Sequence, residues 1–290
     1  MKTLEKNKDR YTLGRRMLQT PVRPLLSILE FIYITGGFSS IKEVMDQLPD
    51  SIETATAVYD NPAKQIQPFL PELTLFQQAR TERPSVLIVD TNDQILDAQS
   101  TASFFLAQSV LEKELESINS LLCGVHQCTL CCMGPSKDMQ NEFFEIPLGQ
   151  EELIHFQLPL LDTRQTAKQL ANEEPPPLFQ GHFFYDHPSP LLAHWQNGWS
   201  MILPRQTACP HLGKGKRCEI YVQRPQVCRR PQIFPYVLEP LPSRESKPCF
   251  RIRNSLLAVM DCPYVQDLQE DIGLYAAASE LELFFSNNKK

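Results

Sequence analysis

The sequence lacks the features that most directly reveal a membrane or secreted protein. The apolar stretch from Leu25 to Ile34 contains Glu30 and is about half as long as a membrane span has to be. The N-terminal segment MKTLEKNKDRYTLGRR is polar and charged, whereas a secretory signal has an apolar centre. We therefore expect a cytoplasmic protein with no membrane span.

Positive charge, glycine and repeats are also scarce. The chain carries 28 Lys and Arg against 34 Asp and Glu, and its net charge of −6 argues against a general nucleic-acid binder. It has no G-x-G-x-x-G nucleotide loop and no repeat of solenoid length. Only 11 glycines stand against 24 prolines, which predicts long irregular connections. With 42% hydrophobic residues, the 290-residue chain can form one large or two modest domains.

What the chain has is cysteine: nine residues, seven of them in two short segments. The first segment is LLCGVHQCTLCCMGP and contains Cys123, Cys128, Cys131 and Cys132. The second is ACPHLGKGKRCEIYVQRPQVCRR and contains Cys209, Cys218 and Cys228. Thiols stay reduced in the cytoplasm, so clustered cysteines there are more typical of metal ligands or redox groups than of disulfides. The odd number of cysteines also fits a disulfide framework poorly.

The spacing of the first segment is typical of a metal chelate. Two residues between Cys128 and Cys131 let a loop turn both sulphurs toward one ion. Cys132 follows directly and points elsewhere unless the backbone bends, so either two metals are bound or one cluster accepts sulphurs from several sides. Four thiolates suffice for one zinc ion or one [4Fe–4S] cluster. The surplus of thiols favours a multi-iron cluster over a single tetrahedral zinc.

Basic residues crowd the second segment. Only Glu219 opposes the seven cations between residues 205 and 230, which are Arg205, Lys214, Lys216, Arg217, Arg224, Arg229 and Arg230. A thiolate-ligated cluster is a net anion, and nearby cations lower the cost of burying it and raise its reduction potential. The alternative is a solvated basic loop that binds nothing.

The second segment has C-P-H-L from Cys209 and then C-E-I-Y-V-Q-R-P-Q-V-C-R from Cys218 to Arg229. This pattern resembles the second half of the CxxCxxCC cysteine-cluster family, also called YkgJ-like, of zinc- or iron-chelating domains. The resemblance covers about residues 123–233. The family has C-x2-C-x2-C-C, whereas this chain has C-x4-C-x2-C-C, so Cys123 lies two residues outside the family spacing.

The resemblance implies a metallocluster. One branch of the family is similar to flagellin lysine N-methylase, which is thought to use S-adenosylmethionine and an iron–sulphur cluster. It therefore also implies, as an alternative, an enzyme that modifies protein lysines. Tyr221, Arg224 and Arg229 are expected to support the cluster from around its ligands.

Other candidate ligands have ordinary explanations. Cys249 and Cys262 have no partner at chelating spacing and are expected in the core, although either could be an extra ligand. The histidines His182, His187 and His211 lie in an aromatic or cysteine-rich context, where packing and hydrogen bonding are the more common roles. No carboxylate or histidine has the partner pattern of a general base or nucleophile.

Periodicity and punctuation predict the secondary structure. Residues 1–20 are expected to be a mobile basic lead. We expect helices over 24–35, from Ser40 to Pro49, over 104–122, over 252–260 and from Val265 to Tyr275. Gly124 would cap the helix over 104–122, and a polar tail would follow the last helix. Strands are expected over 84–90, QILDA and 141–148. The segment SIETATAVYD, which would have to read DNA if the first helices formed a helix-turn-helix, has two acids and no basic residue. We expect no nucleic-acid partner.

Together these patterns predict an α+β protein. A mainly helical region with a short strand pair would span residues 1–122, a loop-rich cysteine-cluster domain 123–262, and a closing C-terminal helix and tail 263–290. The expected function is that of an iron–sulphur protein with a redox or electron-transfer role. The alternatives are the methylase-like enzyme and a zinc-binding structural or interaction protein.

Overall fold

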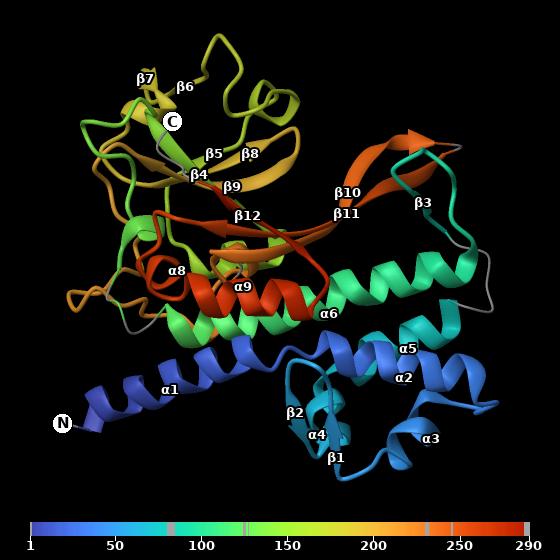
Figure 1. Ribbon diagram of the computed structural model, residues 1–290. Helices are drawn as coiled ribbons and strands as arrows, with labels where there is room; N and C mark the ends of the chain where they lie inside the picture. Colours follow the sequence, from blue (N-terminus) through green and yellow to red (C-terminus); the bar gives the residue numbers. More distant parts are fainter. Residues whose placement is uncertain are drawn as a thin grey trace. The chain divides into compact units, whose positions relative to one another are not determined.

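The computed structural model describes residues 2–79, 85–123, 126, 128–229, 232–244 and 246–286. These form two compact units: described residues 2–123 and 232–286 make up unit 1, and described residues 126–229 make up unit 2. Both units mix helices with small sheets, which confirms the α+β class (Figure 1). None of the helices in the described ranges combines the length and apolar character needed to cross a membrane.

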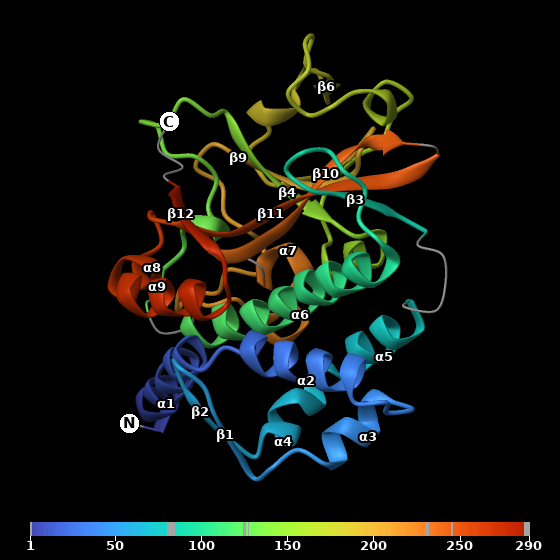
Figure 2. The ribbon, with the colours of Figure 1, turned by 45° about the vertical axis from the view of Figure 1, so that its right-hand side comes forward.

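Unit 1 is built around one long helix, α6. Its elements are α1 (Lys2–Gln19), α2 (Arg23–Thr35), α3 (Ile41–Asp46), β1 (Ser51–Glu53), β2 (Val58–Asp60), α4 (Pro62–Ile66), α5 (Leu70–Ala79), β3 (Leu87–Val89), α6 (Ala98–Leu122), β10 (Ile233–Arg244), β11 (Lys247–Val259), α8 (Pro263–Asp267), α9 (Gln269–Ala278) and β12 (Glu282–Ser286). Helices α1, α2 and α5 lie along one side of α6 and the β10–β11 hairpin lies along the other (Figures 1 and 2).

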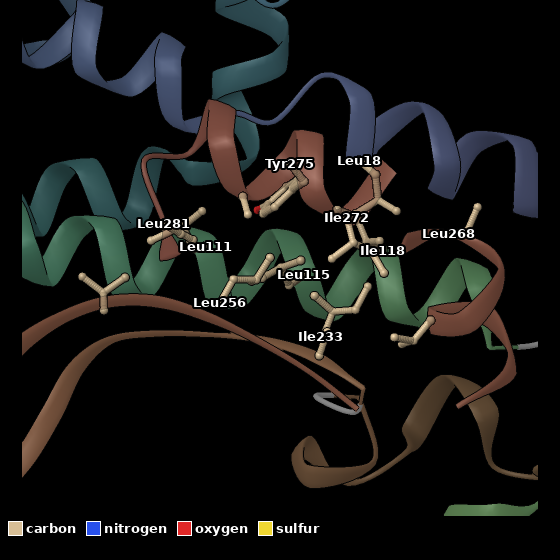
Figure 3. Packing of buried hydrophobic residues seen from close by; sticks show 14 of the residues in the cluster. Leu18, Leu111, Leu115, Ile118, Ile233, Leu256, Leu268, Ile272, Tyr275 and Leu281 are labelled. Carbon is tan, nitrogen blue, oxygen red and sulfur yellow. The ribbon is translucent and has the colours of Figure 1, made fainter. Parts of the chain in front are cut away.

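The predicted apolar stripe of α6 forms the centre of the main core. Leu111, Leu115, Ile118 and Leu122 are buried, and Phe104 packs at the edge. Figure 3 shows this face of the helix meeting side chains from α1, β10, β11 and α9, and Tyr264 and Val265 of α8 belong to the same cluster. A second cluster packs α2, α3, β2 and α5 against the N-terminal half of α6. One helix therefore organises both apolar clusters of unit 1.

A mixed sheet completes unit 1. β10 and β11 are antiparallel, and both β12 and β3 run parallel to β11 at different positions along it. The amide of Asn119, near the end of α6, holds the start of β10: its Nδ2 donates to the Ile233 carbonyl at 2.7 Å and its Oδ1 accepts the Ile233 N–H at 3.3 Å. Tyr264 of α8 donates to the same Oδ1 at 2.5 Å. This buried amide joins three segments that are distant in sequence.

Unit 2 contains a separate sheet in the order β4–β9–β8–β5, and its two apolar clusters mix aliphatic with aromatic side chains. The labels refer to β4 (Phe143–Leu148), β5 (Leu160–Leu161), β6 (Leu178–Phe179), β7 (His182–Phe183), β8 (Leu191–Trp195), β9 (Gly198–Pro204) and the helix α7 (Gln226–Arg229). β6 and β7 form a short hairpin of their own. Outside this sheet, the cysteine segments are single turns and loops.

Several predicted elements are confirmed. Helix α2 begins at Arg23, α6 spans the predicted 104–122, and β4 lies within 141–148. Ser40 caps α3 by accepting the Glu43 N–H, while the Glu43 carboxylate reaches Ser39 instead of closing the box on Ser40. The strand predicted over 84–90 is shorter, at β3, and QILDA contributes only one bridge, from Ile95 to Val89. Gly124 lies outside the described residues.

Three predictions were wrong. The expected mobile lead is helix α1, whose Leu18 is fully buried in the main core. The helix predicted over 252–260 is part of strand β11, because its apolar run is buried between β10 and β12 and such a run carries no period that separates strand from helix. Asn254, at φ +46°, also sits in a β-bulge there. The tail forms strand β12.

The compact units do not share the boundaries expected at residues 123–262. β10 and β11 return to unit 1 because their buried residues Ile233, Val237, Leu256 and Ala258 pack on α6. Alternating burial along a hairpin is a long-range effect that a cysteine count does not reveal. The cysteine-rich unit therefore ends near residue 229 in the described chain, and the C-terminal helices pack in unit 1.

Candidate metal-binding site

The two cysteine segments of unit 2 are joined by backbone hydrogen bonds. The Cys209 N–H donates to the Cys132 carbonyl at 2.8 Å, and the Gly134 N–H donates to the Thr207 carbonyl at 2.8 Å. Between these bonds, Met133 and Ala208 form an antiparallel bridge. Residues about 75 positions apart in sequence are thus held in register, as in a short ladder. This ladder places Cys131 and Cys132 beside Cys209.

Two residues explain why the first segment follows this path. A Cβ on Gly134 would collide with the Pro204 carbonyl, so only glycine allows the segment to approach the end of β9. The Arg205 guanidinium donates from Nη1 to the carbonyls of Ser136, Lys137 and Met139 at 3.2, 3.1 and 2.9 Å. Its Nη2 also pairs with Glu142 at 3.1 Å. The loop after Cys132 is therefore fixed by one side chain.

A tight hairpin brings Cys218 back toward Cys209. Leu212 and Cys218 form an antiparallel bridge, and the Gly213 N–H donates to the Arg217 carbonyl at 2.9 Å. The Glu219 N–H closes the hairpin by donating to the His211 carbonyl at 2.8 Å. The eight residues that separate the two cysteines are therefore an ordered hairpin.

Cys228 lies in the single-turn helix α7, which follows the hairpin after a 3-10 turn over Tyr221–Gln223. The Glu152 carboxylate, from the loop after β4, accepts the Gln226 N–H at 2.7 Å and so caps the first turn. The Arg229 Nε donates to the Arg224 carbonyl at 2.8 Å, which fixes the chain on both sides of the cysteine. Cys228 is therefore positioned by contacts from its own turn and from a distant loop.

Each of five thiols lies within electrostatic range of at least three of the other four. Cys131, Cys209, Cys218 and Cys228 all interact with one another in this way. Cys132 interacts with Cys131, Cys209 and Cys228. They come from three chain segments: the turn at 130–132, the hairpin and α7. The sequence-predicted ligands of unit 2 are thus brought together, apart from Cys128.

The thiols differ in their acidity. A hydrogen bond from Cys132 lowers the pKa of Cys131 to about 7, and the Arg224 guanidinium acts in the same direction. That shared hydrogen bond, and then burial, raise the pKa of Cys132. Burial, followed by the neighbouring Cys131 and Cys209, raises the pKa of Cys228 to about 12. Burial also raises the pKa of both Cys209 and Cys218. A bound cation would favour the thiolate in each case.

Arg224 is the cation of this site. It is buried, its guanidinium carbon lies 3.8 Å from the centre of the Tyr221 ring, and its Nε donates to the Tyr221 carbonyl at 3.2 Å. Its charge lowers the pKa of the Cys131, Cys218 and Cys228 thiols, in each case by less than the larger effects at that thiol. The predicted supporting residues Tyr221, Arg224 and Arg229 therefore form one connected group around the thiols.

The remaining cysteines lie elsewhere. Cys128 is half-buried, and its sulphur accepts the Leu130 N–H at 3.4 Å. Cys123 follows the end of α6 and packs against the main core of unit 1. Cys249 and Cys262 are buried in unit 1, which agrees with the expectation that they are core residues.

Two of the three candidate histidines have other partners. His211 uses Nε2 to bind the His155 carbonyl at 2.6 Å and packs against Phe156. His187 bonds the Ser189 carbonyl through Nδ1 at 2.8 Å and packs against Phe179. His182 is an exposed residue of β7. These contacts are the hydrogen-bonding and packing roles that the sequence context indicated.

The donor chemistry of the thiol group fits a soft or borderline metal, because thiolates are the ligands that zinc, copper(I) and iron–sulphur clusters prefer. As the thiols stand, no three Cys, His, Asp or Glu side chains of the described residues are close enough to hold one ion. Holding a metal would therefore require these side chains to move closer together.

The comparisons add no relative. The chain matches no known family model, no curated protein and no solved structure. The likeness to the cysteine-cluster family thus stays a prediction from the motif alone.

Sequence reasoning missed three residues that shape the site: Gly134, Glu152 and Arg205 in its positioning role. Arg205 was counted only as one cation among seven, and Glu152 lies far from either cysteine segment in sequence. The one local signal was the Gly134-Pro135 pair directly after the first cysteines, which indicates a constrained turn.

Proposed function

We propose that unit 2 binds an iron–sulphur cluster, with [4Fe–4S] as the expected type, and takes part in electron transfer. The observation that carries this proposal is the gathering of five thiols from three chain segments around the buried Arg224. Cysteines without a metal role need no such mutual proximity, because an uncharged cysteine packs as a small apolar residue anywhere in a core.

Cys131, Cys209 and Cys228 are the residues that we expect to hold the group in any arrangement. Each interacts with the other two, and all three interact with Cys132 or Cys218 as the fourth thiol. When bound, an iron–sulphur cluster supplies one-electron transfer. Arg224 would offset the negative charge of the thiolates, and Tyr221 would keep its guanidinium in place.

Zinc is the main alternative occupant, and it would make unit 2 a structural or interaction module. The ordered hairpin between Cys209 and Cys218 is equally compatible with a zinc ion, since both metals accept thiolates. More thiols than one tetrahedral ion can use favour the cluster. The methylase-like enzyme rests on the motif alone and stays a prediction.

Metal and sulphide analysis of protein purified without oxygen tests the proposal. We expect a brown protein with about four irons and four labile sulphides per chain. Cys209→Ser and Cys228→Ser should lose both, whereas Cys249→Ala, in the core of unit 1, should retain them. A colourless protein with stoichiometric zinc would replace the cluster by a zinc site. Full retention of metal by both serine variants would reject the site itself.

A further inference from the structure

The tip of the hairpin between Cys209 and Cys218 carries three exposed cations. Lys214, Lys216 and Arg217 follow one another around the turn, with only Gly215 among them, and we call these three residues the basic loop. Among the described residues, none of the three side chains makes a hydrogen bond or an ion pair. Their charges are therefore directed to solvent.

The other described cations of this segment are used internally. Arg205 binds three carbonyls and Glu142, and Arg229 binds the Arg224 carbonyl. Arg224 is buried on Tyr221. The basic stretch that looked uniform in the sequence thus divides into residues that build the site and residues that face outward. The three residues of the basic loop do not contribute to the structure of the thiol site, so their positive charge needs another explanation.

The basic loop is tied to the thiols by a short, ordered path. The bridge between Leu212 and Cys218 and the bond from the Gly213 N–H to the Arg217 carbonyl fix the turn to two of the five gathered cysteines. Glu219, the one acid of the segment, lies beside Gly213 at the base of the hairpin. A partner that contacts the loop would therefore be held next to the thiol site.

We infer that the basic loop is the docking surface for an acidic protein partner that exchanges electrons with the site. The inference rests on the proposed function for the purpose of the contact. One electron would pass from the reduced one-electron cofactor of the partner to the cluster, which oxidises the partner and reduces the cluster. Exposed cations of this kind raise association rates with oppositely charged surfaces and lose that effect as salt rises.

A protein fits this surface better than a nucleic acid does. Three cations on one turn make a compact patch, whereas nucleic-acid binding requires basic residues along a track of phosphates. The chain as a whole also carries a net charge of −6, which opposes the approach of a long polyanion. An acidic surface on a folded protein could contact the basic loop without approaching the rest of this negatively charged chain.

Fluorescence anisotropy of a labelled peptide of alternating Glu and Ser tests the inference on the full chain at an ionic strength of about 20 mM. The triple variant Lys214→Gln, Lys216→Gln and Arg217→Gln should bind this peptide about tenfold more weakly than the native chain. The matched control changes three other exposed cations of unit 2, Lys137, Arg164 and Lys168, to Gln and should bind as the native chain does. Binding should weaken at about 150 mM salt.

Equal binding by the native chain and the basic-loop variant would overturn the inference. Tighter binding of single-stranded DNA of the same charge than of the peptide would also overturn it and would point to a nucleic-acid surface. The readout needs no bound metal. A zinc-loaded or metal-free protein that still binds the peptide through the loop would uphold the docking surface while the redox function fails.

Discussion

Different interactions stabilise the interior of unit 1 and the interior of unit 2. In unit 1, long elements bury apolar side chains against α6 over two clusters. In unit 2, a small sheet has its own packing, but the cysteine segments beside it depend on backbone bonds and on polar clamps such as Arg205. Burial stabilises the first kind of structure without a ligand, whereas the second leaves thiols that a metal could join.

The two units can be followed separately in one experiment. Both tryptophans, Trp195 and Trp199, lie in unit 2, so tryptophan fluorescence reports on that unit. Among the described residues, every α-helix except the single-turn α7 belongs to unit 1, so circular dichroism at helical wavelengths reports mainly on unit 1. A change confined to unit 2 should therefore appear in the fluorescence signal, and a change confined to unit 1 mainly in the dichroism signal.

Metal removal should have the largest effect. If the proposed metal is bound, the double variant Cys209→Ser and Cys228→Ser should lower the stability seen by fluorescence by several kcal/mol, because the binding free energy of a metal adds to the folding free energy. The dichroism transition should stay close to that of the native protein. Chemical unfolding followed by both signals measures this. A change of equal size in both signals would contradict a metal site confined to unit 2.

Truncation in the α6 core should have the next largest effect, on the opposite signal. Leu115 is buried at the centre of the main core, so Leu115→Ala should lower the unfolding free energy of unit 1 by about 4 kcal/mol. Leu75→Ala, on the exposed face of α5, is the matched control and should cost little. An equally small effect of Leu115→Ala would show that α6 does not organise the core.

Glu114 should make the stability of unit 1 depend on pH. Its buried carboxylate accepts the Val22 N–H at 2.9 Å and the Tyr275 O–H at 2.6 Å, and burial raises its pKa from 4.5 to about 7. The folded state therefore binds its proton more tightly than the unfolded chain does. The stability present below pH 4.5 is lost as the pH rises toward 7, by up to about 3 kcal/mol.

Glu114→Gln should make the stability of unit 1 less dependent on pH, while its side-chain amide can still form hydrogen bonds with Val22 and Tyr275. Dichroism-monitored unfolding between pH 4.5 and 8 gives the slope for the variant and the native protein. Glu53→Gln, an exposed residue of β1, removes the same charge and should leave the slope as it is. Identical slopes for the native protein and Glu114→Gln would contradict the assignment.

Loss of the Arg205 clamp should have the smallest effect of the four. Arg205→Met removes hydrogen bonds to three carbonyls and the pair with Glu142, and it should lower the stability seen by fluorescence by about 2 kcal/mol. Arg164→Met is the control, because Arg164 is exposed in the same unit. A matching loss in the control would show that the clamp contributes nothing specific.

Local signals in the sequence predicted local structure well. The cap at Ser40 and the apolar period of α6 depend on residues three and four positions apart, which is the distance over which helices are specified. Strand β11 was misread because its identity depends on β10, β12 and β3, none of which its own residues reveal.

The site was predictable in its residue types but not in its geometry. The spacing of the cysteines indicated a ligand set, and the structure gathers five of the seven predicted ligands. The pairing of Cys132 with Cys209, and the separation of the cations into bound and exposed groups, depend on contacts between distant segments. Cys123 was grouped by its position in the chain, although its surroundings belong to the α6 core.

The clasp that Asn119 forms with the start of β10 has a consequence for the order of events during synthesis. The described part of unit 2 is translated after Asn119 and before Ile233, at the start of β10. The apolar face of α6 therefore leaves the ribosome well before the strands that cover it. At ordinary rates of elongation that interval is on the order of 10 s. We expect nascent chains to need chaperone protection of α6 in this interval, while the cysteine-rich insertion already has the whole of its own sequence available for folding.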